Sequence, residues 1–315
     1  MIDPHMLHYL IVGATIALPA LCVGIGQGIA GKALSEALDT QPASHKELNY
    51  LFFLGITMME FTCLLGVIMG LLLLYRPTPT DAMAITQAGA ALALVLPACL
   101  IGIAAAYPLS NIFYAFARQP LSYQKLLRQL LLTQIMLQTP ILFGFIISIF
   151  IHQQTTLALE LPQAIKLFAS GALFAFGIVG PIIGITLFAK AACEAMGFNR
   201  NAHDTIFSFT FISQTIIETP ILFVLIVALF LCFGPVSSAT YAPTAYLLSA
   251  LCMTMTTLAA GISSGRTAQT ACEQIGKNLH AFPLLSGTSL LGQVFIETNT
   301  IYGLIIVIVM LFTLP

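Results

Sequence analysis

Three glutamates and one glutamine recur at a nearly constant spacing inside strongly apolar segments. Glu60, Gln138, Glu218 and Glu297 lie 78, 80 and 79 residues apart, and the segments around them (MEFTCLLG, LQTPILFG, IETPILFV and IETNTIYG) align without gaps. A carboxylate in an apolar segment is costly unless it holds a proton, binds an ion or pairs with a cation, so such residues mark ion or proton pathways. The pattern predicts three carriers of a small cation, and one position, Gln138, at which an amide that cannot ionise has replaced the carrier.

The composition of the chain places these residues in a membrane. Of its 315 residues 58% are hydrophobic and 7% are charged, and the net charge is −1. These values are far from those of soluble domains, and a net charge near zero provides no basic surface for nucleic acid. The seven cysteines and six histidines have no ligand spacing. We therefore expect no metal site, no cofactor and no catalytic residue.

Apolar stretches of membrane-spanning length recur along the whole chain, and a bilayer requires about 20 residues for each span. They cover residues 7–31, 50–75, 84–114, 128–152, 167–195, 206–233, 243–272 and 284–313. Because each repeat contains two spans, we predict an all-α membrane protein of eight transmembrane helices, arranged as four tandem parallel-repeat helical hairpins. The predicted hairpins are residues 1–80, 81–158, 159–238 and 239–315.

The few cations predict the orientation of the hairpins. Arg76 and Lys166 lie near the linkers between hairpins, whereas the other lysines and arginines lie in or beside the turns within hairpins. This second group comprises Lys32, Lys46, Arg118, Lys125, Arg128, Lys190, Arg200, Arg266 and Lys277. By the positive-inside rule, the turns within hairpins are cytoplasmic and both termini face the opposite compartment. The expected location is a bacterial inner membrane or an organellar equivalent.

The two helices of each hairpin differ in kind. First helices are rich in small residues, as in GIGQGIAGKA at 24–33 and AAGISSG at 259–265, whereas second helices are bulky. Small residues let helix backbones approach closely, so first helices suit a crowded inner layer and second helices a lipid-facing layer. Glu60, Gln138, Glu218 and Glu297 are called the carrier register here, and they are expected about ten residues into each second helix. Pro140 and Pro220 lie two positions after this register and are predicted to kink their helices.

The sequence resembles the proteolipid of rotary F-type ATP synthases, which is their c-ring component. The resemblance rests on the first helix VGIGQGIAGKALSEALDTQP, the polar turn ARQP and the second helix IETNTIYGLII. It implies a closed ring of about three or four chains that turns in the lipid membrane against a stator, the a-subunit. The stator's arginine would strip the proton from each glutamate in turn, and the cytoplasmic turns would hold the γ and ε subunits of the central stalk.

The resemblance also implies which turn residues contact the stalk. The Arg-Gln-Pro turn is complete only in the second hairpin, so the contact is expected to differ among hairpins. The implied contact residues are Gln41, Pro42, Arg118, Gln119, Pro120, Arg200 and Lys277.

The identity of the ion, a proton or sodium, depends on the supply of oxygen ligands. In sodium-carrying relatives these ligands are a first-helix glutamine, a hydroxyl just after the glutamate and a tyrosine further on. The corresponding auxiliary ligands here are Gln27, Thr139, Thr219, Ser264, Thr298 and Tyr302. Phe61 replaces the hydroxyl after Glu60, and Ile185 replaces the glutamine near Glu218, which favours protons.

Other function classes remain open at this point. Fused proteolipids that lack a carboxylate also resemble those of V-type and A-type ion-pumping ATPases. A low number of ions moved per ATP suits a pump that hydrolyses ATP to move ions against a large gradient. An unrelated eight-span secondary transporter would need an asymmetric cavity. A purely structural oligomer would leave the carboxylates at matching depth unexplained.

Overall fold

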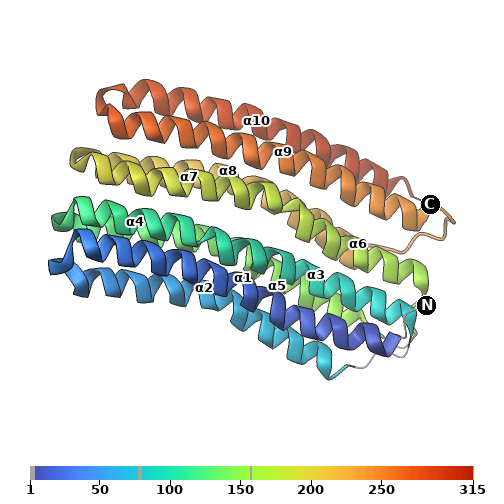
Figure 1. Ribbon diagram of the computed structural model, residues 1–315. Coiled ribbons are helices and arrows are strands. Elements are labelled where there is room, and N and C mark those ends of the chain that lie inside the picture. The colour runs from blue at the N-terminus through green and yellow to red at the C-terminus, as the bar shows by residue number, and fades with distance from the viewer. Residues whose placement is uncertain (1–3, 77–79, 157, 315) are drawn as a thin grey trace.

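The computed structural model describes residues 4–76, 80–156 and 158–314, which are almost entirely helical (Figure 1). Within these residues, 8 helical segments are long and apolar enough to cross a membrane. The prediction of an all-α membrane protein with eight transmembrane helices is therefore confirmed.

The helices form four hairpins, named here by their order in the chain. Hairpin 1 contains α1 (Pro4–Thr40) and α2 (His45–Leu74); hairpin 2 contains α3 (Asp81–Ala104), α4 (Ala106–Arg118) and α5 (Tyr123–Gln154). Hairpin 3 contains α6 (Leu161–Gly177), α7 (Val179–Phe198) and α8 (His203–Phe233); hairpin 4 contains α9 (Ala242–Lys277) and α10 (Phe282–Phe312). The turns within hairpins lie together at one end of the molecule, and both termini lie at the other end (Figure 1).

The hairpins stand side by side in chain order. First helices pack on one another, α1 against α3 and α4, α3 and α4 against α6 and α7, and these against α9. Second helices follow the same order, α2, α5, α8 and α10. Hydrogen bonds between neighbouring hairpins join residues about one repeat apart, such as Asn111 Nδ2 to Lys190 O and Gln154 Nε2 to Cys232 O. Neighbouring hairpins are therefore in register.

The first helices of hairpins 2 and 3 are interrupted in the middle. α3 ends at Ala104 and α6 ends at Gly177, four residues before Pro108 and Pro181 respectively. Proline lacks the N–H that would bond to the carbonyl four residues earlier, and its ring collides with that carbonyl. The chemistry of proline therefore accounts for both breaks.

The prolines of the second helices leave these helices unbroken. α5 and α8 continue as helices through Pro140 and Pro220. The observed interruptions thus lie in first helices, at positions where the sequence pattern did not predict them.

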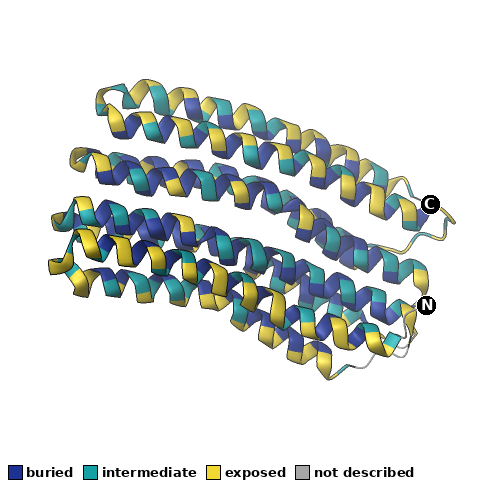
Figure 2. Ribbon diagram, in the orientation of Figure 1, coloured by how far each residue is buried: buried dark blue, intermediate teal, exposed yellow. Residues whose placement is uncertain are grey.

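Glycines allow first helices to touch through their backbones. A Cβ atom at Gly184 of α7 would collide with the carbonyl oxygen of Gly261 of α9, and one at Gly265 would collide with the backbone of Gly184. Buried residues accordingly concentrate on the first helices of hairpins 2 and 3, whereas hairpins 1 and 4 carry more exposed residues (Figure 2).

Replacing Gly184 by alanine should destabilise the chain. Overpacking costs about 1–3 kcal/mol, and this outweighs the gain in helix propensity of about 1 kcal/mol. Gly287 of α10 is a matched control because a Cβ atom there would meet nothing within 4 Å. Thermal unfolding in detergent, followed by circular dichroism, should show a lower Tm for Gly184→Ala and an unchanged or higher Tm for Gly287→Ala. Equal Tm values for the two variants would contradict this explanation.

Candidate ion-carrier sites

The carrier-register residues lie in the middle of four helices of nearly equal length. Glu60, Gln138, Glu218 and Glu297 are each the sixteenth residue of their helices, which are 30, 32, 31 and 31 residues long. The expectation of about ten residues was wrong, because each helix begins directly after its turn, in polar residues that precede the apolar stretch. A central position in the helix places the side chain near the middle of the bilayer.

Glu60 is exposed and bonds to a residue of its own hairpin. The Nε2 atom of Gln27 on α1 donates to Glu60 Oε1 on α2 over 3.1 Å. Gln27 was predicted as an auxiliary ligand, and the structure brings it to the carboxylate. The amide N–H makes this contact, so the structure shows a hydrogen-bond donor at the carboxyl group and no oxygen ligand from Gln27.

Gln138 is buried at the interface with hairpin 1. It is 7% exposed, and its Nε2 atom donates to the backbone oxygen of Met58 over 2.9 Å. A carboxylate could not make this bond because it has no hydrogen to donate. The amide therefore connects two hairpins where the other hairpins carry an acid.

Glu218 and Glu297 are more buried than Glu60. Glu297 is 7% exposed, and its carboxyl group lies close to Thr219 of the preceding hairpin, whose hydroxyl donates to Thr215 O of its own helix over 3.3 Å. The Oε1 atoms of both glutamates are buried and have no hydrogen-bond partner among the described residues. Each of these carboxyl groups therefore retains an acceptor for a proton or a cation.

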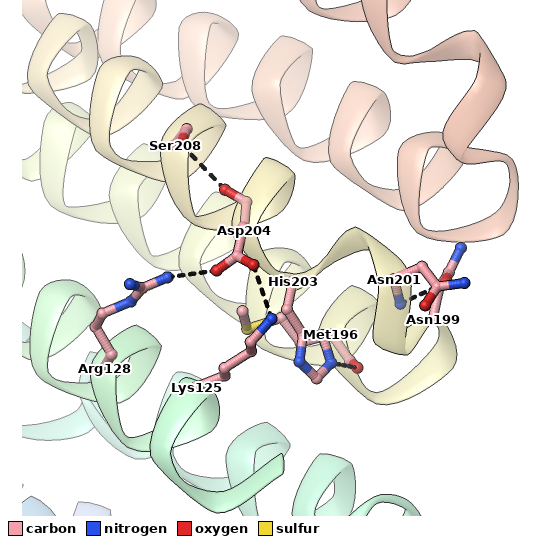
Figure 3. Close-up of polar contacts among 8 residues, drawn as sticks. All are labelled: Lys125, Arg128, Met196, Asn199, Asn201, His203, Asp204 and Ser208. Carbon is pink, nitrogen blue, oxygen red and sulfur yellow. Dashed lines mark hydrogen bonds and ion pairs between the residues drawn. The ribbon is translucent and has the colours of Figure 1, made fainter.

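No carrier forms an ion pair within the described part of the chain. The ion pairs there are Lys32 with Glu36, and Asp204 with both Lys125 and Arg128. The Asp204 cluster links hairpins 2 and 3 close to the turns (Figure 3). These ion pairs thus lie toward the turn end, and the mid-membrane acids take part in none of them.

The other predicted auxiliary ligands are distributed unevenly. Thr139 and Thr298 donate their hydroxyls to carbonyls of their own helices, Ile135 O at 3.2 Å and Phe295 O at 2.6 Å. Tyr302 is 64% exposed, and within the described chain no hydrogen bond joins it to Glu297. Ser264 is fully buried with its hydroxyl unpartnered among the described residues. Thr219 likewise donates to Thr215 O over 3.3 Å, so among the predicted auxiliary ligands only Gln27 hydrogen-bonds to a carboxylate.

Three buried glutamines near the carriers were not predicted. Gln134, Gln214 and Gln293 each lie four residues before the carrier register, and therefore on the same helix face. Gln214 is completely buried, and neither atom of its amide has a hydrogen-bond partner among the described residues. A buried unpartnered amide costs about 1–3 kcal/mol, so this position suits a water or an ion ligand. The repetition of glutamine before the carrier in three of the four repeats was a signal available in the sequence.

Two of the predicted stalk-contact residues bond to the next hairpin. The Arg118 guanidinium lies 4.8 Å from the centre of the Phe198 ring, and Gln119 Nε2 donates to Gly197 O over 3.1 Å. The others keep exposed or half-exposed side chains at the turn end, namely Gln41, Pro42, Pro120, Arg200 and Lys277. Hairpin 2 therefore uses part of its Arg-Gln-Pro turn to hold hairpin 3.

The helical hairpins with mid-helix acids define a multi-pass membrane proteolipid, and the comparisons with known proteins identify its family. The family of ATP synthase C subunits matches residues 10–73, 88–151 and 247–310, which together are more than half of the chain. The chain belongs to this family. The matched segments lie in hairpins 1, 2 and 4.

Single proteins similar to this chain have about the length of one hairpin. The ATP synthase c-subunit of Gloeobacter violaceus is 38% identical over 69 residues, which are 22% of this chain and 84% of that protein. The same values hold for the ATP synthase c-subunit of Thermosynechococcus vestitus. The ATP synthase c-subunit of Prochlorococcus marinus is 42% identical over 55 residues, which are 18% of this chain and 68% of that protein.

Proposed function

We propose that the chain is a rotor-ring proteolipid of a rotary ATP synthase, which carries protons across the membrane on Glu60, Glu218 and Glu297. The observation that carries this proposal is the equal depth of the three acids in a chain of the ATP synthase C-subunit family. Three carboxylates at the middle of three helices, without a cation near them in the described chain, are too costly to serve packing alone.

Partners follow from this role. Three or four copies would close a ring in the membrane, turning against the arginine of the stator's a-subunit. The turn end, with its lysines and arginines, would face the cytoplasm and contact the γ and ε subunits of the central stalk. The exposed side chains of Pro42, Arg200 and Lys277 and the half-exposed side chain of Gln41 support this assignment.

Hairpin 2 acts as a spacer in this scheme. Gln138 does not ionise near neutral pH, and its amide is engaged with Met58 O. The fixed positive charge of a stator arginine can favour proton release to water only from a group that becomes negative. The hairpin therefore passes the stator without moving an ion, and each chain moves three ions per turn of the ring instead of four.

The choice of ion rests on the site around Glu218. Hairpin 3 has Ile185 where a first-helix glutamine would supply an oxygen, and this favours protons over sodium. Gln214 is a buried amide close by in the sequence, so it is the residue that would serve sodium if sodium were carried. Labelling of the carriers should therefore be compared with and without sodium.

Labelling with dicyclohexylcarbodiimide, which attacks protonated carboxyl groups in membranes, tests the carrier assignment. We expect mass spectrometry of the labelled complex to find adducts at Glu60, Glu218 and Glu297. Gln138 is the internal control, because it has the same register and no carboxyl group. Sodium should leave the labelling unchanged if protons are carried and should suppress it if sodium is carried. Absence of adducts at all three glutamates would contradict the carrier role.

A further inference from the structure

A second polar register lies in the first helices, toward the end of the molecule that carries the termini (Figure 1). His8 of α1, Gln87 of α3, Lys166 of α6 and Tyr246 of α9 are 79, 79 and 80 residues apart. All four are buried, with exposed fractions of 3%, 0%, 3% and 2%. Because a polar group withdrawn from water needs a partner, each of these side chains must find one in the protein or in a bound ligand.

Three of these four side chains have partners in the protein. In hairpins 1 and 2, His8 Nδ1 lies 2.8 Å from Gln87 Oε1, and Gln87 Nε2 donates to Arg76 O over 2.7 Å. In hairpin 4, the hydroxyl of Tyr246 accepts a hydrogen bond from Ser237 N over 2.9 Å. Hydrogen bonds within the chain therefore account for the polar groups at these three positions.

Lys166 is the exception, because its ammonium has no counter-charge. Its Nζ atom donates to Gly234 O, whereas an ammonium has three N–H donors. None of the ion pairs among the described residues includes it. Its polar neighbours include Cys232, whose Sγ atom lies 3.1 Å from Ser170 Oγ, and Tyr246, whose ring centre lies 6.0 Å from Nζ. Neither neighbour is a carboxylate, so one positive charge stays unmatched within the described chain.

Extension toward water does not explain this lysine. A lysine near the end of a membrane helix often stretches its stem so that the ammonium reaches the interface, and the side chain then stays exposed. Lys190, in the first helix of the same hairpin, is exposed in this way, whereas Lys166 is 3% exposed. A charged ammonium that is closed off from water is unstable unless an anion pairs with it.

A small cavity lies beside this ammonium. Its volume is about 110 Å³, and Lys166, Tyr246 and Ser237 are among its lining residues, together with apolar side chains of α8 and α10. Residues 235–237 of the linker between hairpins 3 and 4 form part of its wall. Pockets for larger ligands have volumes of roughly 300–1,000 Å³, whereas one water needs only about 10–15 Å³ of such space. The cavity therefore has room for a small ion with a few waters.

We propose that this cavity binds one monovalent, weakly hydrated anion of the halide class, chloride in the cell, which the Lys166 ammonium holds between hairpins 3 and 4. One ammonium balances one negative charge, so a divalent oxyanion would keep an uncompensated charge. Chloride gives up its water more readily than fluoride, which suits a cavity with a largely apolar lining. The anion would join the α6 and α9 helices at the end opposite to the turns. The site lies outside the carrier register and does not depend on the proposed ring function.

Thermal unfolding of the full chain in detergent tests this site. Gluconate keeps the ionic strength constant while chloride replaces it at millimolar concentrations, at which general salt effects are small. A ligand that binds only the folded chain raises the Tm once its concentration exceeds the Kd, so the wild-type Tm should rise with chloride and with bromide but not with sulfate. Lys190→Met removes an exposed charge from the same hairpin and should keep the full rise. Lys166→Met should show no rise.

Direct binding provides a second measurement that needs no variant. Equilibrium dialysis of the wild-type chain against radioactive chloride should find one bound chloride per chain, which unlabelled bromide displaces and sulfate does not. The Lys190→Met chain should bind the same amount, and the Lys166→Met chain should bind none. A wild-type chain that binds no chloride, or a Lys166→Met chain that binds as much as the wild type, would overturn the proposal.

Discussion

Glu218→Gln should reduce ATP-driven ion pumping, measured by a fluorescent pH probe in vesicles containing the whole complex, to less than about a tenth of the wild-type rate. Hairpin 2 already carries an amide at this depth, so the variant would place two neutral hairpins next to each other. Hairpins 2 and 3 would then have to pass the stator one after the other, and neither would carry a group that can take up and release a proton.

Two control variants identify the cause of that loss. Glu218→Asp keeps a carboxyl group, shortened by one methylene, and should retain a measurable part of the activity. Gln138→Met changes the neighbouring spacer without adding a charge, and should leave pumping close to the wild-type rate. Wild-type pumping by Glu218→Gln would show that Glu218 is not a carrier.

Converting the spacer into a carrier should require two substitutions, Gln138→Glu and Phe61→Thr. Gln138→Glu alone places a carboxyl group beside the Met58 carbonyl, which now accepts a bond from the amide over 2.9 Å. Two acceptors repel, so the new group would keep its proton and would not exchange it. Phe61 occupies the position of Thr219, which lies close to the Glu297 carboxyl group of the next hairpin. A threonine there would supply the donor that the ionised form needs.

The double variant would raise the carriers per chain from three to four. The smallest electrochemical driving force that supports ATP synthesis should therefore fall by about a quarter, since each charge contributes in proportion to the potential. Imposed potentials across proteoliposomes measure this threshold. Phe61→Thr alone is the matched control and should leave it unchanged. A threshold that falls equally in Gln138→Glu alone would show that the hydroxyl is unnecessary.

Much of the fold could be predicted because the sequence consists of four similar repeats. Four segments of similar length, each with two apolar spans and a polar turn, determine the number and order of the helices. The depth of Glu60, Glu218 and Glu297 follows from the same alignment. Their distance from the helix start was underestimated, since polar residues after each turn continue the helix outside the apolar stretch.

Contacts between hairpins were harder to predict. The alignment gives the position of each residue along its helix, and therefore its depth in the membrane. The bond from Gln138 to Met58 O depends instead on how one hairpin is rotated against the next. The breaks before Pro108 and Pro181 were not predicted, because kinks were expected only at the prolines beside the carriers. Gln214 was missed because a glutamine in an apolar helix has no charge, although its recurrence in three hairpins marks the face that bears the acids.

The unequal hairpins have a consequence for motion. Going along the chain, the distance from Glu60 to the next acid is two hairpins, whereas Glu218 and Glu297 are on adjacent hairpins. In a rotating assembly each long angular interval between successive loading events would be followed by two short ones, so torque would be delivered irregularly. Any element that couples to such a rotor would have to carry it across the longer interval with energy gained over the shorter ones.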